Sequence, residues 1–211
     1  MTGDGEPLLT PEKRFRIVGL GDSTTAGTPG FRSPVEAPPD GEGDRKSQYS
    51  YWMMKRHPDW EVLNRGVNGE RSDQVLARFQ RDVLPAGPEC VIILAGVNDV
   101  YQGFPNGFIM QNLDRMYGLV RAEGARLVAA SVLPFNSMSE SQAAAMEGLN
   151  NWIEARSSSL SASFCDTGAA VSDPANPGKL LDSPDGLHPG LEGYRLMGEA
   201  LAQVLEGSSP G

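Results

Sequence analysis

Cysteine and histidine are both scarce in this chain of 211 residues, with two of each. Cys90 and Cys165 each lie in an apolar, strand-like stretch, so we expect two small buried side chains rather than a disulfide framework. No Cys/His/Asp cluster has metal-ligand spacing, and two histidines leave little from which to build one. The sequence therefore predicts no metal site.

Positive charge and long apolar runs are scarce as well. Lys and Arg number 18 against 27 Asp and Glu, which gives a formal net charge of −9. Without a basic surplus to displace phosphate counterions, we expect neither a nucleic-acid partner nor docking on anionic membranes. No apolar run approaches the roughly 20 residues of a membrane span. The first residues lack the basic start and apolar core of a secretory signal, so we expect a cytoplasmic protein.

The chain does contain a regular alternation of two kinds of segment. The composition is typical of one globular domain, which we place at residues 14–206, with an arm at 1–13 and a tail at 207–211. Strands are predicted near 15–20, 60–64, 90–95, 126–132 and 162–166, with helices near 47–57, 72–83, 109–123, 139–159 and 189–204. This alternation predicts an α/β fold with a doubly wound parallel sheet covered by helices on both faces.

A serine follows the first predicted strand directly, in Gly21-Asp22-Ser23. The carboxyl end of a parallel sheet is where α/β proteins bind ligands, but a serine hydroxyl needs a base before it can act as a nucleophile. His57 ends a charged helix before a proline, and we expect it to be an exposed surface residue. His188 lies three residues after Asp185, whose carboxylate can turn back and accept the Nδ1 proton. Taken alone, this segment also fits an ordinary Asp-Gly turn with a capping histidine.

Acyl transfer also needs hydrogen-bond donors for the developing oxyanion. Gly66 and Asn98 both follow predicted strands at the same sheet edge as Ser23, and the Ser23 backbone N–H is a further candidate donor. A turn glycine and a loop cap are the alternative interpretations of the first two residues. We expect Asp22 and Asp99 to fix turns around the site by accepting backbone N–H bonds.

Two nucleotide-binding motifs are excluded at the first strand. Gly19-Leu20-Gly21 begins like a dinucleotide fingerprint, but Thr24 occupies the position of the third glycine. A phosphate-binding loop would need Gly-Lys-Ser/Thr, and Asp22 would put an anion where the phosphate lies. The sequence therefore predicts no cofactor.

Four short blocks along the chain together resemble the SGNH hydrolase family, also called GDSL esterases and lipases. These blocks are Gly21-Asp22-Ser23, Gly66 within Asn-Arg-Gly-Val-Asn-Gly, Gly96-Val97-Asn98-Asp99 and Asp185-Gly-Leu-His188. The resemblance implies a flavodoxin-like, three-layer α/β/α fold with five parallel strands. It also implies Ser23 as nucleophile, His188 as base, Asp185 as its orienting acid, and an oxyanion hole from Ser23, Gly66 and Asn98. The family's Gly-Asp-Ser-Leu reads Gly-Asp-Ser-Thr here.

The expected function is that of a serine esterase, which hydrolyses short-chain acyl esters of small soluble molecules through an acyl-enzyme without a cofactor. A carbohydrate O-acetylesterase and an acyl thioesterase fit the same residues, and an inactive binding module of the same fold is the alternative outside the enzymes. The Pro- and Gly-rich stretch at 24–46 is too long for an ordinary connection. It predicts either a wall or lid over the site, or a mobile surface excursion.

Overall fold

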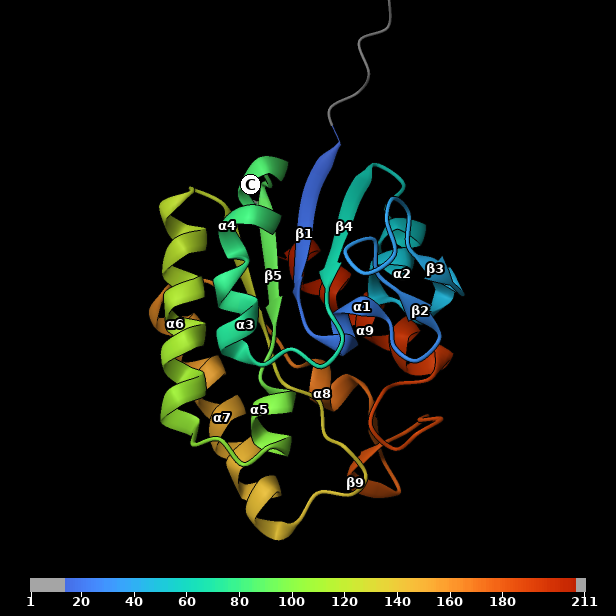
Figure 1. The fold of residues 1–211 in the computed structure, drawn as a ribbon, viewed down its shortest axis with the longest axis vertical. Helices are drawn as coiled ribbons and strands as arrows, with labels where there is room; N and C mark the ends of the chain where they lie inside the picture. The colour runs from blue at the N-terminus through green and yellow to red at the C-terminus, as the bar shows by residue number, and fades with distance from the viewer. Residues whose placement is uncertain (1–13, 208–211) are drawn as a thin grey trace, which may run out of the picture.

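The computed structural model describes residues 14–207, and its centre is a parallel sheet of five strands in the order β4-β1-β5-β6-β7 (Figure 1). The strands are β1 (Phe15–Gly21), β4 (Trp60–Gly66), β5 (Cys90–Leu94), β6 (Arg126–Ala130) and β7 (Ser163–Cys165). β1 pairs with β4 on one side and β5 on the other, so the chain reverses its direction of winding at β1. The carboxyl ends of these strands meet at a switch point of the kind where ligands bind.

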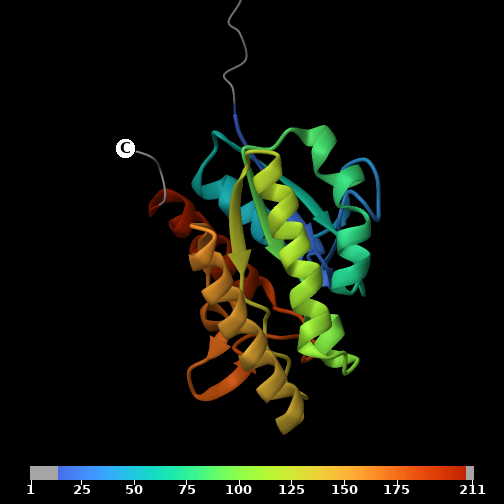
Figure 2. The same ribbon diagram turned by 90° about the vertical axis from the view of Figure 1, so that its left-hand side faces the viewer.

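Helices cover both faces of the sheet. One face carries α2 (Tyr49–Arg56) and α9 (Leu191–Gly207), and the other carries α3 (Ser72–Ala77), α4 (Phe79–Asp82), α6 (Asn106–Ala122) and α7 (Glu140–Ser159) (Figures 1 and 2). Neighbouring strand residues point to opposite faces, so Ile17 packs among the α2 and α9 side chains and Val18 among those of α3, α6 and α7. The predicted three-layer α/β/α fold is confirmed.

The connections contain short elements that the sequence did not predict. They are α1 (Ser23–Ala26), β2 (Phe31–Arg32), β3 (Glu42–Gly43), η1 (Arg45–Ser47), η2 (Leu84–Ala86), α5 (Val97–Tyr101), α8 (Thr167–Ala170), β8 (Ser172–Asp173) and β9 (Asn176–Leu180). The stretch at 24–46 is therefore not wholly irregular, because β2 and β3 pair in a two-residue antiparallel ladder and Phe31 is buried. The helix predicted at 72–83 is divided into α3 and α4 at Arg78.

The predicted arm at 1–13 lies outside the described residues, as does the predicted tail except for Gly207, which ends α9. Cys90 and Cys165 are buried free thiols in β5 and β7, as predicted. Burial raises the pKa of each thiol to about 12. Within residues 14–207, no helix combines the length and apolarity that a membrane crossing requires.

Candidate active site

Ser23 is presented by a tight turn at the end of β1. A Cβ on Gly21 would lie 2.0 Å from the carbonyl oxygen of Leu94, so only glycine fits between these two central strands. Asp22 then caps α1, because its Oδ1 accepts the Thr24 N–H at 3.0 Å. Ser23 is the first residue of that short helix and is only 3% exposed. The turn holds its hydroxyl at the carboxyl edge of the sheet, where α1, α5 and α8 gather (Figure 1).

His188 comes from the loop before α9 and faces Ser23. Its Nε2 lies 2.9 Å from Ser23 Oγ, and its Nδ1 lies 2.7 Å from Asp185 Oδ2. The other oxygen of Asp185 accepts the backbone N–H groups of Leu187 and His188 at 2.9 and 2.8 Å. Ser183 Oγ donates to the His188 carbonyl at 2.7 Å. A continuous chain of hydrogen bonds thus runs from Asp185 through the imidazole to Ser23.

The electrostatics of this loop favour an ionised Asp185. Partial burial works to raise the pKa of Asp185, but the hydrogen bonds from the His188 ring and from the His188 and Leu187 backbones lower it below its usual value. An ionised Asp185 holds the proton of His188 on Nδ1, which leaves the Nε2 lone pair facing Ser23 Oγ. In this arrangement the imidazole can accept a proton from the serine hydroxyl.

Asn98 lies at the same edge, in α5 just after β5. Its Nδ2 donates to the carbonyl oxygen of Glu70 at 2.8 Å. A side-chain amide carries two N–H donors, so this bond orients the group and leaves a second donor. Asn98 is half-buried and can therefore meet a small ligand.

The backbone N–H of Gly66, predicted as an oxyanion donor, already donates a hydrogen bond within the protein. The Gly66 N–H donates to Asn64 Oδ1 at 2.9 Å, and the Gly66 carbonyl accepts the Ser33 hydroxyl at 2.5 Å. By contrast, no described residue accepts a hydrogen bond from the Gly69 N–H, and Gly69 is exposed in the left-handed region at φ 76°. Gly69 also adjoins Glu70, the acceptor of the Asn98 amide. The open backbone donor beside Asn98 is thus at Gly69.

Asp22 and Asp99 are both buried aspartates beside the site. Burial raises the pKa of Asp22 to about 7, and the Thr24 N–H offsets this effect only in part. Asp99 accepts the Ser72 N–H at 2.8 Å and the Ser72 hydroxyl at 2.7 Å, which fixes the start of α3 against α5. Burial raises the pKa of Asp99 as well, against these two bonds. Each carboxylate thus fixes the start of a helix that follows a site loop.

His57 lies at the opposite edge of the sheet, next to the start of β4. The prediction that it is an exposed residue was wrong, because its ring stacks on Trp60 at 3.9 Å between centroids and its Nε2 lies 2.6 Å from Glu206 Oε1. These contacts leave the side chain 25% exposed. Since Trp60 begins β4 and Ser23 follows β1, the parallel sheet separates His57 from the serine.

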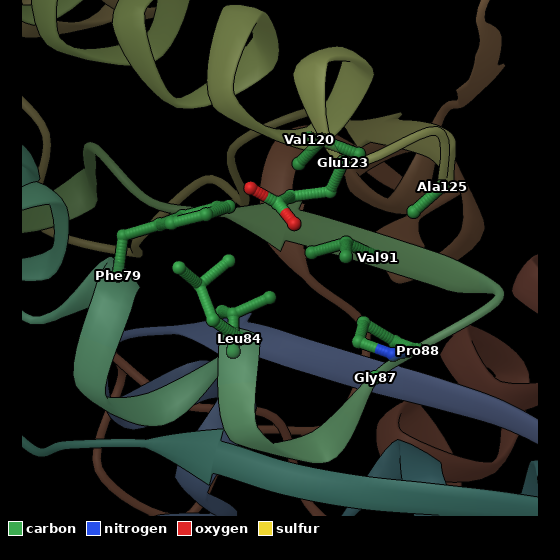
Figure 3. A pocket seen from close by; sticks show the side chains of 9 residues that line it. Phe79, Leu84, Gly87, Pro88, Val91, Val120, Glu123 and Ala125 are labelled. Carbon is green, nitrogen blue, oxygen red and sulfur yellow. The ribbon is translucent and has the colours of Figure 1, made fainter.

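Cavities lie at both ends of the sheet among the described residues. A cavity of about 190 Å³ lies between α4 and the end of α6, at the amino ends of β5 and β6 and so at the edge opposite Ser23 (Figure 3). The Glu123 carboxylate points into it. A second cavity, of about 250 Å³, lies between α7 and α8 beside the loop after β6. Asn136 in that loop donates its N–H to the Gly186 carbonyl at 2.7 Å, which ties this cavity's wall to the His188 loop.

No group of three His, Cys, Asp or Glu side chains within residues 14–207 is arranged to hold a metal ion.

Residues 20–196, which are most of the chain, match the model of the GDSL-like Lipase/Acylhydrolase family. The chain belongs to this family. The predicted family is confirmed, and its description is that of lipases and acylhydrolases.

Two curated relatives of this GDSL-family chain are esterases. An arylesterase of Vibrio mimicus is 28% identical over 117 residues, which are 56% of this chain and 54% of the relative. Esterase TesA of Pseudomonas aeruginosa is 34% identical over 79 residues, which are 37% of this chain and 39% of the relative. These matches span about half of the first relative's length and less of the second's.

A solved structure supports the fold over nearly the whole chain. A GDSL-like lipase from Bacteroides thetaiotaomicron VPI-5482 superposes with a TM-score of 0.75 at 24% identity, over 96% of this chain and 93% of that one. At this identity the likeness concerns the fold.

Proposed function

We propose that this protein is a serine esterase that hydrolyses carboxylic esters through an acyl-enzyme on Ser23. The hydrogen-bond chain from Asp185 to His188 to Ser23, at 2.7 and 2.9 Å, carries this proposal. His188 Nε2 takes the hydroxyl proton as Ser23 Oγ attacks the ester carbonyl, and then gives it to the leaving alcohol. The same nitrogen next removes a proton from water, which attacks the acyl-enzyme, and returns that proton to Ser23 Oγ as the acid leaves. Asp185 stabilises the imidazolium that forms in each half-reaction.

Three N–H donors stabilise the tetrahedral oxyanion in this proposal: the Ser23 backbone, the Asn98 amide and the Gly69 backbone. Gly69 takes the place predicted for Gly66, whose N–H already donates to Asn64. The bond from Asn98 to Glu70 supports this choice, because it keeps the Asn98 amide beside the backbone that follows Gly69. Preorganised donors of this kind each lower the barrier by roughly 3–4 kcal/mol.

The substrates we propose are short-chain acyl esters. Ser23 is almost wholly buried, so a small acyl group reaches its hydroxyl more easily than a long or branched one. The stretch at 24–46 supplies one wall, because Ser33 binds the Gly66 carbonyl and Glu36 Oε1 accepts the Asn68 N–H at 3.1 Å. This wall is built next to the proposed donor at Gly69.

Replacing the nucleophile tests the activity directly. Ser23→Ala is expected to lower kcat on p-nitrophenyl acetate on the order of 10⁴-fold and to abolish covalent labelling by a fluorophosphonate, with an unchanged circular dichroism spectrum. Ser50→Ala is the matched control, because Ser50 is also buried but lies in α2, where its hydroxyl donates to Gln48 Oε1. A Ser23→Ala variant that cleaves the ester near the parent rate would exclude Ser23 as the nucleophile.

A substrate panel tests the chemical class. We expect p-nitrophenyl acetate and butyrate to be cleaved with a higher kcat/KM than the laurate ester, and to be preferred over an acetylated sugar and an acyl thioester. A much faster reaction on the acetylated sugar would instead identify a carbohydrate O-acetylesterase. An unlabelled parent protein that cleaves none of these substrates would be a binding module.

A further inference from the structure

Arg78 is a buried arginine that connects the ends of two neighbouring strands. It lies between α3 and α4, and its side chain is 5% exposed. Its Nη2 donates to the carbonyl oxygen of Gly21 at 2.7 Å, and its Nη1 donates to that of Arg65 at 2.8 Å. These carbonyls lie at the carboxyl ends of β1 and β4, so one guanidinium spans both strands two residues before Ser23.

The same guanidinium also reaches the segment that carries the proposed oxyanion donors. Its Nε donates to Glu70 Oε2 at 2.5 Å. The backbone carbonyl of Glu70 in turn accepts the Asn98 amide at 2.8 Å. Arg78 is thus linked to Ser23 through Gly21 and Asp22 on one side, and to Asn98 through Glu70 on the other.

Two carboxylates compensate the buried charge. Arg78 Nη1 donates to Asp82 Oδ2 at 2.8 Å, in addition to the bond with Glu70. A buried ion pair is costly to desolvate and is weak evidence for stability by itself. The two backbone carbonyls are therefore the informative partners, because an ion pair alone would not require them.

We propose that Arg78 is a positioning residue, which holds the Ser23 turn and the Asn98 amide in the relative placement that ester hydrolysis needs. This inference rests on the proposed function. The planar guanidinium donates four hydrogen bonds in fixed directions here, to Gly21, Arg65, Glu70 and Asp82. Lysine keeps the charge but is a compact ammonium without this fork. Charge and geometry can therefore be separated by substitution.

The test compares Arg78→Lys with Arg81→Lys. Arg81 also donates to Asp82, but its side chain is 68% exposed and its hydrogen bonds end at that carboxylate. We expect Arg78→Lys to lower kcat on p-nitrophenyl acetate about 10- to 100-fold, with KM changed less than threefold, because small misplacements of catalytic groups have effects of this size. Arg81→Lys is expected to stay within twofold of the parent in both constants.

A double-mutant cycle separates positioning from a merely structural role. If Arg78 acts through the oxyanion donors, the effects of Arg78→Lys and Asn98→Ala on kcat are not independent. The fold-decrease in kcat of the double variant is then expected to be at least five times smaller than the product of the fold-decreases of the two single variants. A kcat of Arg78→Lys within twofold of the parent overturns the inference. The inference is also overturned if the fold-decrease in kcat of the double variant equals the product of the two single fold-decreases within a factor of two. A lower melting temperature of Arg78→Lys without a change in kcat per folded molecule overturns it as well.

A rescue experiment tests Arg78→Ala, which removes the guanidinium altogether. In folded Arg78→Ala, methylguanidinium at millimolar concentration is expected to restore part of kcat with saturation, whereas methylammonium is not. Equal restoration by both ions overturns the geometric argument. If Arg78→Ala does not fold, Arg78→Lys and the cycle decide. A parent enzyme that is inactive and unlabelled contradicts the proposed function, whereas an active parent with a parent-like Arg78→Lys contradicts only this inference.

Discussion

The buried Asp22 leads to a prediction about stability and pH. Its pKa rises from 3.8 to about 7 in the folded protein, mainly through burial. A raised pKa means that the folded state binds the proton more tightly than the unfolded state does. The stabilisation of the folded state by proton binding to Asp22 is fully present below pH 3.8 and is lost as the pH rises through about 7. Integrated between pH 5 and pH 8, this linkage lowers the free energy of unfolding by about 2 to 3 kcal/mol.

Asp22→Asn isolates this effect, because the amide oxygen can still accept the Thr24 N–H while the group no longer titrates. The free energy of unfolding is measured by urea denaturation at pH 5, 6, 7 and 8, with an exposed aspartate, Asp40→Asn, as the control. We expect the variant to gain about 2 to 3 kcal/mol on the parent between pH 5 and pH 8, and the control to gain none. A constant difference between parent and Asp22→Asn across this range would refute the reasoning.

The remaining predictions concern the donors and the second histidine. Asn98→Ala is expected to lower kcat roughly 10²- to 10³-fold in p-nitrophenyl acetate hydrolysis, and an unchanged kcat would remove Asn98 from the oxyanion hole. Gly66→Ala is expected to lower the melting temperature strongly, because its Cβ would lie 2.0 Å from the backbone nitrogen of Ala26. A Cβ on Gly69 would meet open space, but the positive φ of this residue is unfavourable for alanine, so Gly69→Ala is expected to cost about 1–2 kcal/mol of stability. Per folded molecule, Gly69→Ala is expected to lower kcat more than Gly66→Ala does. The reverse order would favour Gly66 as the donor. His57→Ala is expected to keep kcat within twofold, and a large loss would reopen the choice of base.

The sequence predicts the sheet well because strand and helix periodicities are local properties. The apolar run at Cys90–Leu94 is fully buried in β5, and the Ser72 segment does begin a helix. His188 was separable from His57 because Asp185 precedes it at a spacing that a turn can close. These inferences needed only residue type and short-range order.

Contacts between distant segments could not be predicted in this way. Arg78 has no sequence signal, since the two carbonyls that it binds belong to strands that only the folded sheet brings together. One signal at Gly66 was available, because asparagine side chains often bind the backbone two residues on, and Asn64 does so here. The Asn68-Gly69 pair, a typical turn sequence, was the better place to expect an open backbone N–H.

Ser23 and His188 are 165 residues apart in the chain, and the loop that holds His188 leads directly into α9. α9 packs against α2 and anchors the early part of the chain, since the Tyr194 hydroxyl donates to the Thr28 carbonyl at 2.7 Å. In the proposed mechanism, His188 therefore reaches Ser23 only after α9 has docked on elements made far earlier. During synthesis on the ribosome, a chain in which the edge strands β4 and β7 had already formed would still be unable to hydrolyse an ester by this mechanism.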